Sequence, residues 1–130
     1  MVLKKNLIIH LFGNLGINYN VMTKLSILLC AHCPNEKYDN LIVKAISSIY
    51  EQSYKDYKLF IVLDQCWDGT LSKVKDVITP DTEIIIRNKK EGLARAKNAG
   101  LEKINTEYVA FLDADDEYLP GKLEKQMNFI

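Results

Sequence analysis

Apolar runs alternate along the chain with segments in which apolar residues recur every three or four positions. Leu25–Ala31 is a short apolar run of the kind expected for a strand covered on both faces. Similar runs predict strands over 59–63, 84–86 and 108–112. Because strand and helix alternate four times, we predict an α/β fold with an open, mostly parallel sheet, flanking helices and right-handed crossovers.

The segments between the strands carry the periodicity of helices. Asp39 and Thr70 have the short polar side chains that cap helices, and Pro80 follows the second helix as a stop signal. The predicted helices are 39 to about 52, 70–78, 91–104 and one that begins near Pro120. Residues 1–22 precede this pattern, and we expect them to form a loosely attached N-terminal extension of a domain over 23–130.

The composition narrows the class of protein. The chain has 130 residues, with 17 Lys plus Arg against 17 Asp plus Glu. A net charge of zero argues against nucleic-acid binding, which needs a basic surplus. Three cysteines are too few for a disulfide framework. No apolar run approaches the length of a transmembrane helix, so we expect a cytoplasmic protein without a membrane-spanning segment.

Acidic residues follow two of the predicted strands directly. Asp64 comes after one strand, and Leu112-Asp-Ala-Asp-Asp116 begins at the end of another. In parallel α/β sheets the carboxyl ends of the strands share one edge, where ligands bind. We therefore expect Asp64 and Asp113 to lie at the same edge.

Three carboxylates within four residues repel one another unless a cation neutralises them. Oxygen ligands suit Mg²⁺ or Mn²⁺, and Mg²⁺ is commonly held by one or two carboxylates together with substrate phosphates. The cluster is therefore consistent with a divalent metal that bridges a diphosphate. The alternative is structural, with Asp115 or Asp116 capping the helix near Pro120 while the other acids are solvated.

Lys97 lies in the middle of an apolar helix face. The face is formed by Leu93, Ala96, Gly100, Leu101 and Ile104. A lysine at this position either meets an anionic partner or extends its stem to reach solvent, because burial without a partner is too costly. Gly100, one turn further, allows the helix to approach the sheet closely.

Taken together, four stretches resemble the N-terminal, nucleotide-sugar-binding half of family 2 glycosyltransferases. They are Leu25–Leu29 with Asn35-Glu36 and the helix around 45–54, Val62-Leu-Asp-Gln-Cys-Trp-Asp-Gly-Thr70, Gly92-Leu-Ala-Arg-Ala-Lys-Asn-Ala-Gly100, and Leu112–Asp116 with the segment that follows it. The resemblance covers nearly everything from Lys24 to Ile130. It implies the Rossmann-like GT-A fold and transfer of a sugar, with inversion, from a nucleotide-diphosphate donor, expected to be a UDP-sugar.

The resemblance also implies roles for individual residues. It places nucleotide contacts at Ala31, Glu36, Asp64, Lys97 and Asp113. Asp64 takes the position that accepts a hydrogen bond from the base, and Lys97 the position near the diphosphate. Asp113 and Asp115 match the carboxylates that bind Mn²⁺ or Mg²⁺. The acceptor, whether glycan, lipid or protein, is not indicated.

The sequence departs from the family pattern at several positions. Leu63 replaces the first of two usual acids, and Cys30-Ala-His-Cys33 stands where proline, a hydroxyl residue and an aromatic are commoner. Lys97 replaces arginine, which keeps the charge without the planar fork. The family's catalytic base lies in the second half of the domain, expected beyond Ile130. We therefore expect the donor half of a transferase, truncated or naturally short.

Other interpretations remain open at this stage. Cys30 and Cys33 have the spacing and position of a thioredoxin-like redox pair. A zinc site from these cysteines with His32 and Cys66 is conceivable, although adjacent residues of a strand point apart. A third possibility is a non-catalytic module that binds a nucleotide sugar, or that self-associates through an exposed sheet edge as a homo-oligomer.

Overall fold

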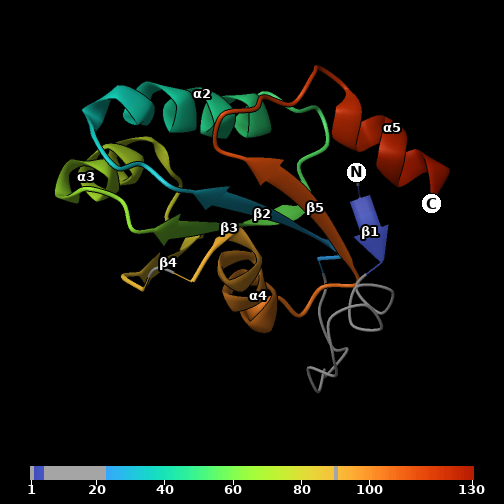
Figure 1. Ribbon diagram of the computed structural model, residues 1–130. Helices are drawn as coiled ribbons and strands as arrows, with labels where there is room; N and C mark the ends of the chain where they lie inside the picture. The colour runs from blue at the N-terminus through green and yellow to red at the C-terminus, as the bar shows by residue number, and fades with distance from the viewer. Residues whose placement is uncertain (1, 5–22, 90) are drawn as a thin grey trace.

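The structure, a computed structural model, describes residues 2–4, 23–89 and 91–130. The strands are β1 (Val2–Lys4), β2 (Leu25–Ala31), β3 (Tyr57–Asp64), β4 (Glu83–Arg87) and β5 (Tyr108–Asp113). The helices are the 3₁₀ turn η1 (Glu36–Tyr38), α2 (Asp39–Tyr50), α3 (Asp68–Val77), α4 (Leu93–Lys103) and α5 (Lys122–Phe129). The strand order is β1-β5-β2-β3-β4, and every neighbouring pair is parallel except β1 with β5 (Figure 1). The predicted α/β fold with a mostly parallel sheet is confirmed.

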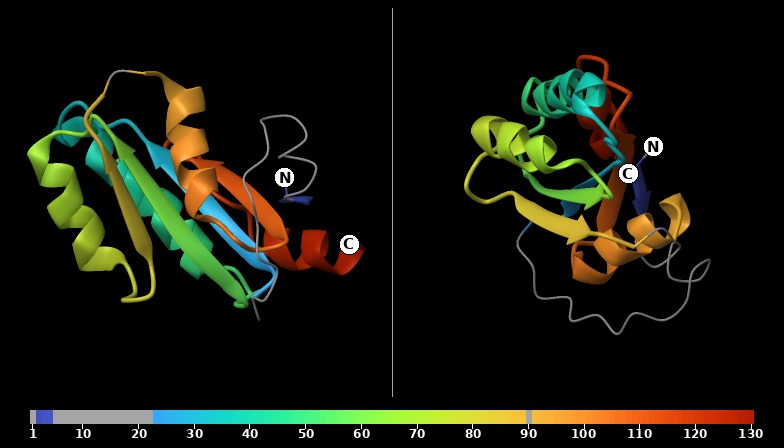
Figure 2. Two further views of the ribbon diagram at one scale, coloured as in Figure 1. Left: turned by 90° about the horizontal axis from the view of Figure 1, so that it is seen from below. Right: turned by 60° about the vertical axis from the view of Figure 1, so that its left-hand side comes forward.

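The sheet lies between two layers of helices (Figures 1 and 2). Helices α2, α3 and α5 lie on one face, and α4 lies on the other. Each face has its own apolar core, because side chains alternate along a strand. Ile27 and Ile61 pack toward α2, whereas Leu28 and Phe60 pack toward α4. All seven residues of β2 are buried, as the apolar run predicts.

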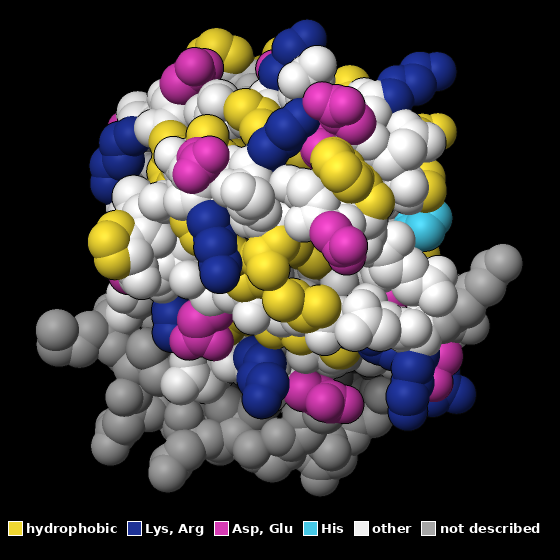
Figure 3. Space-filling view, turned by 90° about the vertical axis from the view of Figure 1, so that its left-hand side faces the viewer, with side chains coloured by type: hydrophobic (Ala, Val, Ile, Leu, Met, Phe, Trp, Pro, Cys, Tyr) yellow, Lys and Arg dark blue, Asp and Glu magenta, His cyan; other side chains and the backbone are white. Residues whose placement is uncertain are grey.

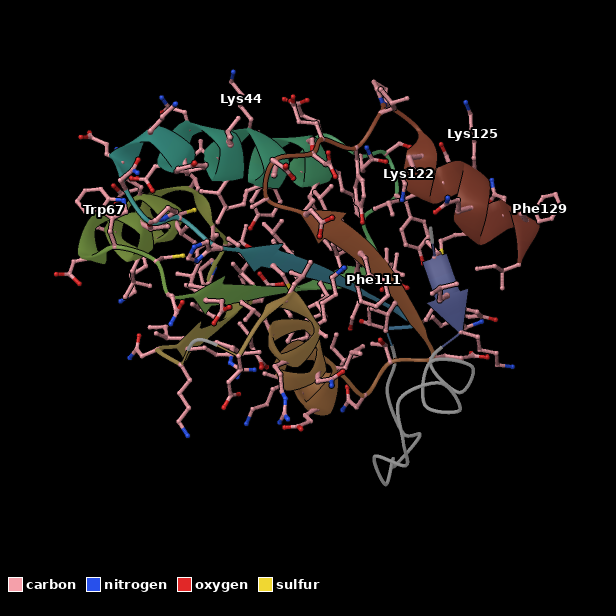
Figure 4. All side chains as sticks on the ribbon, in the orientation of Figure 1. Lys44, Trp67, Phe111, Lys122, Lys125 and Phe129 are labelled. Atoms are coloured by element: carbon pink, nitrogen blue, oxygen red, sulfur yellow. The ribbon has the colours of Figure 1, made fainter. Side chains whose placement is uncertain are left out.

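Asp39 and Thr70 do not cap their helices. Asp39 is the first residue of α2, and its carboxylate is fully buried. It accepts hydrogen bonds from Thr70 Oγ1 at 2.7 Å and from Trp67 Nε1 at 3.1 Å. Helix α3 begins two residues before Thr70, at Asp68. The two polar residues therefore bind each other and hold the start of α2 against the start of α3, where Figure 4 shows Trp67.

Helix α2 ends at Tyr50, so Gln52 lies outside it. The buried Gln52 amide donates to the carbonyl of Leu119 at 2.9 Å and accepts from the backbone N–H of Leu123 at 3.0 Å. Ser48 Oγ accepts from the backbone N–H of Tyr118 at 2.9 Å. Two polar residues at the end of α2 thus anchor the segment that follows the acidic cluster.

Helix α4 packs closely on the sheet. A Cβ added at Gly100 would lie 2.4 Å from Leu28 Cδ1 and 3.1 Å from Val62 Cγ2, which confirms the expected close approach. The helix begins at Leu93 rather than 91, because Gly92 has a φ of 88° that breaks the helical path. Leu93 was predicted to pack on the sheet but is 55% exposed, because it belongs to the first turn beyond the edge of the core.

The sequence pattern did not reveal β1, which has only three residues. Val2 pairs with Ala110 and Lys4 with Tyr108. Residues 5–22, which make up most of the expected N-terminal extension, lie outside the described residues, so the domain boundary stays a prediction.

The last helix begins at Lys122, two residues after Pro120. Among the described residues, no helix is both long and apolar enough to cross a membrane.

Candidate functional site

The carboxyl ends of β3, β2 and β5 bring acidic residues from separate parts of the chain to one edge. Ala31 pairs with Leu63, directly before Asp64, and Cys30 pairs with Asp113. Asp64 and Asp113 therefore flank the end of β2, two strand spacings or about 10 Å apart. Figure 3 looks at the side toward which the β2 and β3 arrows of Figure 1 point. Hydrophobic side chains gather near its centre, with acidic and basic ones around them.

One hollow, the β3-side hollow, has a volume of about 360 Å³. Its lining residues are Cys30, Ala31, His32, Asp64, Gln65, Gly92, Leu93 and Ala96. Asp64 Oδ1 is buried, and among the described residues it has no hydrogen-bond partner. Because a buried acceptor without a partner is unfavourable, this oxygen is suited to accept a hydrogen bond from a ligand.

The chain turns sharply after Asp64. Gln65 has a φ of 51°, in the left-handed region that non-glycine residues seldom adopt. Its backbone N–H donates to the carbonyl of Arg87 at 2.8 Å, which holds the turn against the end of β4. His32 Nδ1 donates to the carbonyl oxygen of Asp64 at 2.9 Å, so Nε2 is left as an acceptor in the neutral ring. The backbone on both sides of Asp64 is thereby fixed.

A second hollow, the β5-side hollow, adjoins the first and has a volume of about 370 Å³. Its lining residues are Cys30, His32, Tyr38, Leu41, Leu93, Asp113, Ala114 and Asp115. Three of these residues also line the β3-side hollow, namely Cys30, His32 and Leu93. The two hollows are therefore neighbouring parts of one site, with Asp64 in one and the acidic cluster in the other.

Lys97 meets an anionic partner, one of the two outcomes expected for it. Its Nζ lies 3.7 Å from Asp113 Oδ1 and 5.6 Å from the centre of the Phe111 ring. The two charged side chains are 33% and 47% exposed, so water screens the pair. The positive charge stands beside the acidic cluster and remains accessible to a further anion.

Asp113 and Asp115 offer two carboxylates at the rim of the β5-side hollow. Among the described residues, no group of three or more acidic, histidine or cysteine side chains is arranged to hold a metal ion. A divalent ion here would need oxygens from a ligand or from water, which is how Mg²⁺ usually binds. The two carboxylates therefore fit an ion that arrives with a diphosphate.

The alternative helix-capping role of the acidic cluster is wrong. Helix α5 has Gly121 as its N-cap residue, and no side chain caps it. Asp116 donates its backbone N–H to the carbonyl of Asp113 at 3.0 Å, which closes a turn between β5 and the following segment. Asp116 is exposed and lines neither hollow. Of the three acids, Asp113 and Asp115 line the β5-side hollow, whereas Asp116 lines a separate hollow with Asp113 and Lys97.

Of the other predicted contacts, one lies at the site and one does not. Ala31 lines the β3-side hollow. Glu36 lines neither hollow, and its carboxylate lies 3.4 Å from Lys73 Nζ instead. The β5-side hollow is also lined by Leu93, Tyr38 and Leu41, which were not predicted from the sequence to lie at the site. Their only sequence signal was an apolar or aromatic side chain near the start of a helix, which most often indicates packing.

The cysteines do not form the redox pair that their spacing suggested. Cys30 packs in the core beneath α4, whereas Cys33 packs in the core beneath α2, on the opposite face of the sheet. Burial raises the pKa of the Cys30 thiol to about 12, contrary to the low pKa of a catalytic thiol. His32 turns to the carbonyl of Asp64, and among the described residues no zinc-binding group is present.

Comparison with known proteins identifies the family. The model of "Glycosyl transferase family 2" matches residues 26–130. The chain belongs to this family. A relative from Campylobacter jejuni, a GalNAc(5)-diNAcBac-PP-undecaprenol beta-1,3-glucosyltransferase, is 37% identical over 109 residues, which cover 82% of this chain and 34% of the relative.

Solved structures of GT-A glycosyltransferases share the fold of this chain. Residues 1–349 of Staphylococcus aureus TarS superimpose with a TM-score of 0.68 at 20% identity, over 82% of this chain and 32% of that fragment. The Pyrobaculum calidifontis mannosyltransferase PcManGT, in complex with GDP-Man and Mn²⁺, gives a TM-score of 0.64 at 25% identity, over 79% of this chain and 30% of that enzyme. The chain thus spans about a third of the length of the Campylobacter jejuni relative, of the TarS fragment and of PcManGT.

Proposed function

We propose that this chain forms the donor site of a glycosyltransferase that uses a nucleotide-diphosphate sugar, a UDP-sugar in the first instance, and Mn²⁺ or Mg²⁺. The observation that carries the proposal is the partnerless buried oxygen of Asp64 in the same site as Asp113 and Asp115. One end of the site offers an acceptor for a base N–H, and the other offers carboxylates for a cation. The complex of the related mannosyltransferase with GDP-Man and Mn²⁺ supports this assignment.

In this proposal the base of the donor lies in the β3-side hollow, and its diphosphate lies in the β5-side hollow. Asp64 accepts from the base in the β3-side hollow, and Ala31 and His32 form the wall beside it. Asp113 and Asp115 are the residues that would hold the ion in the β5-side hollow. A bound divalent ion would stabilise negative charge on a departing diphosphate. Lys97 adds a second positive charge beside Asp113.

Transfer to an acceptor needs a base that removes the acceptor's proton. The carboxylates that line the two hollows are Asp64, Asp113 and Asp115, and each already has a proposed role. The assignment of the base to a residue beyond Ile130 therefore stays a prediction, as do inversion and the acceptor. None of the carboxylates that line the hollows is left to act as the base. This favours a second candidate function, in which these residues bind the nucleotide sugar and do not transfer it.

Calorimetric titration with UDP, with and without Mn²⁺, tests the donor site. We expect binding that needs the ion and that falls at least about tenfold in Asp115→Asn. Asp116→Asn is the matched control, because it removes a neighbouring carboxylate that lines neither hollow. Equal binding with and without Mn²⁺, or equal losses in both variants, would contradict the metal role. Binding of a UDP-sugar that is never hydrolysed or transferred would support the second candidate.

A further inference from the structure

Cys33 and Cys66 lie together at the base of the loops that follow β2 and β3. The backbone N–H of Cys33 donates to Cys66 Sγ at 3.3 Å. The backbone N–H of Trp67 donates to the carbonyl of Cys33 at 2.8 Å. Chain segments joined by such bonds run about 5 Å apart, and a disulfide bridges Cα atoms roughly 4.4–6.8 Å apart. The two hydrogen bonds hold the Cys33 and Cys66 segments side by side, with Cys66 Sγ against the Cys33 backbone, and both thiols are free.

The two thiols differ in exposure and acidity. Cys66 is partly exposed, whereas Cys33 is 1% exposed. The Cys33 thiol hydrogen-bonds to Cys66, and this bond lowers the pKa of Cys66 and raises that of Cys33. His32 lowers the pKa of Cys66 further. Cys66 is thus the more exposed residue and the thiol that ionises more readily, and Cys33 carries the thiol that can resolve a mixed disulfide.

The pair is connected to the β3-side hollow. Cys66 Sγ lies 3.6 Å from the carbonyl oxygen of Ala31, which lines that hollow. Cys66 follows Asp64 by two residues, and Cys33 follows His32 directly. A new bond between the sulfurs would turn Cys66 away from its contacts with Ala31 and the Cys33 backbone. Such a turn would remove the sulfur contact with the carbonyl of Ala31, at the wall of the β3-side hollow.

We propose that Cys33 and Cys66 form a reversible disulfide that controls access of the nucleotide to the site. The oxidant is a small-molecule disulfide such as oxidised glutathione. The Cys66 thiolate attacks one sulfur of the oxidant, forms a mixed disulfide and releases one reduced thiol. The Cys33 sulfur then displaces the second, so that the protein pair loses two hydrogens and two small thiols are released.

The first experiment measures the disulfide in the absence of any nucleotide. The chain is equilibrated in buffers with different ratios of reduced to oxidised glutathione, and free thiols are then blocked and analysed by mass spectrometry. We expect a protein that has lost two hydrogen atoms, with fragment ions that join Cys33 to Cys66. The bridge persists in Cys30→Ser, whereas Cys33→Ser stops at a glutathione adduct on Cys66. A bridge that includes Cys30, or none under any ratio, would overturn the proposal.

The second experiment measures control of binding and rests on the proposed function. We expect UDP with Mn²⁺ to bind the oxidised chain about tenfold more weakly than the reduced chain, and reductant to restore the affinity. Equal affinities in a chain shown to be bridged would overturn the control of binding. If the reduced chain does not bind UDP, the proposed function fails, while the disulfide is still decided by the first experiment.

Discussion

The two hollows of the site differ in how firmly hydrogen bonds hold their residues in place. In the β3-side hollow, the backbone around Asp64 is fixed by hydrogen bonds from His32 and Gln65, and the loop beyond it is held by the buried carboxylate of Asp39. In the β5-side hollow, Asp113 is about half exposed, and its ion pair with Lys97 is loose at 3.7 Å.

This difference indicates how the proposed donor binds. A base has a fixed shape and pattern of hydrogen-bond donors, so a preformed pocket can recognise it with little loss of entropy. A diphosphate brings its own charge and, with an ion, its own ligands. The protein therefore needs only two carboxylates and one cation at that end. We infer that the β3-side hollow is rigid before binding and that the β5-side hollow is completed by the ligand.

The largest expected effect on stability comes from removing the Asp39 carboxylate, which holds the loop beside the β3-side hollow. Asp39→Ala leaves the buried hydroxyl of Thr70 and the partly buried indole N–H of Trp67 without their acceptor. We expect the free energy of unfolding, measured by urea denaturation, to fall by about 3 kcal/mol. The exposed carboxylate of Asp76, in α3, provides the control. Asp76→Ala should change stability by no more than about 0.5 kcal/mol, and equal losses would contradict a rigid β3 side.

Gly100→Ala tests the close packing of α4, the helix whose first turn contributes to both hollows. The added methyl would approach Leu28 within 2.4 Å inside a packed core. We expect the variant to lose about 1–3 kcal/mol in the same denaturation experiment. Ala99→Gly, at the preceding helical position, separates this effect from glycine's helix propensity, which accounts for about 1 kcal/mol. A Gly100→Ala variant as stable as the parent would show that α4 can shift on the sheet.

Asp64→Asn separates binding from stability in the β3-side hollow. The variant removes the charge of a half-buried carboxylate whose buried Oδ1 has no partner among the described residues, so we expect the free energy of unfolding to stay equal or rise by up to about 1 kcal/mol. We expect UDP affinity, measured by calorimetry, to fall about tenfold. A clear loss of stability without a loss of affinity would assign Asp64 to the fold rather than to the site.

The smallest effect on stability and affinity is expected beside the β5-side hollow. In Lys97→Met the aliphatic stem remains and the charge is removed, so the screened ion pair with Asp113 is lost at a cost of no more than about 0.5 kcal/mol in stability. UDP affinity should fall about threefold, and the loss should shrink as salt is added. A salt-independent loss would show that Lys97 acts by contact rather than by charge.

The sequence predicted the parts of the fold that follow from periodicity. The apolar run of β2 matches the observed strand at both ends, and the position of Asp64 and Asp113 after strands placed them at one edge. These predictions succeeded because parallel strands impose a fixed direction and burial on both faces.

The sequence could not reveal contacts between distant polar residues. Asp39 and Thr70 looked like helix caps because capping is the common role of short polar side chains, and only the tertiary structure brings them together. The cysteine spacing pointed to Cys30 with Cys33, but Cys30 packs on one face of the sheet, whereas Cys33, beyond the end of β2, packs on the other face beside Cys66. The short β1 had too few residues for a period to be recognised.

The most direct test of the central claim is a crystal structure of the chain with UDP and Mn²⁺, with the ion located by its anomalous scattering. We predict the base within hydrogen-bond distance of Asp64 Oδ1 and the Mn²⁺ peak on the carboxylate of Asp115, with the diphosphate between them. A nucleotide that leaves Asp64 Oδ1 without a partner, or a Mn²⁺ peak away from the acidic cluster, would contradict the account.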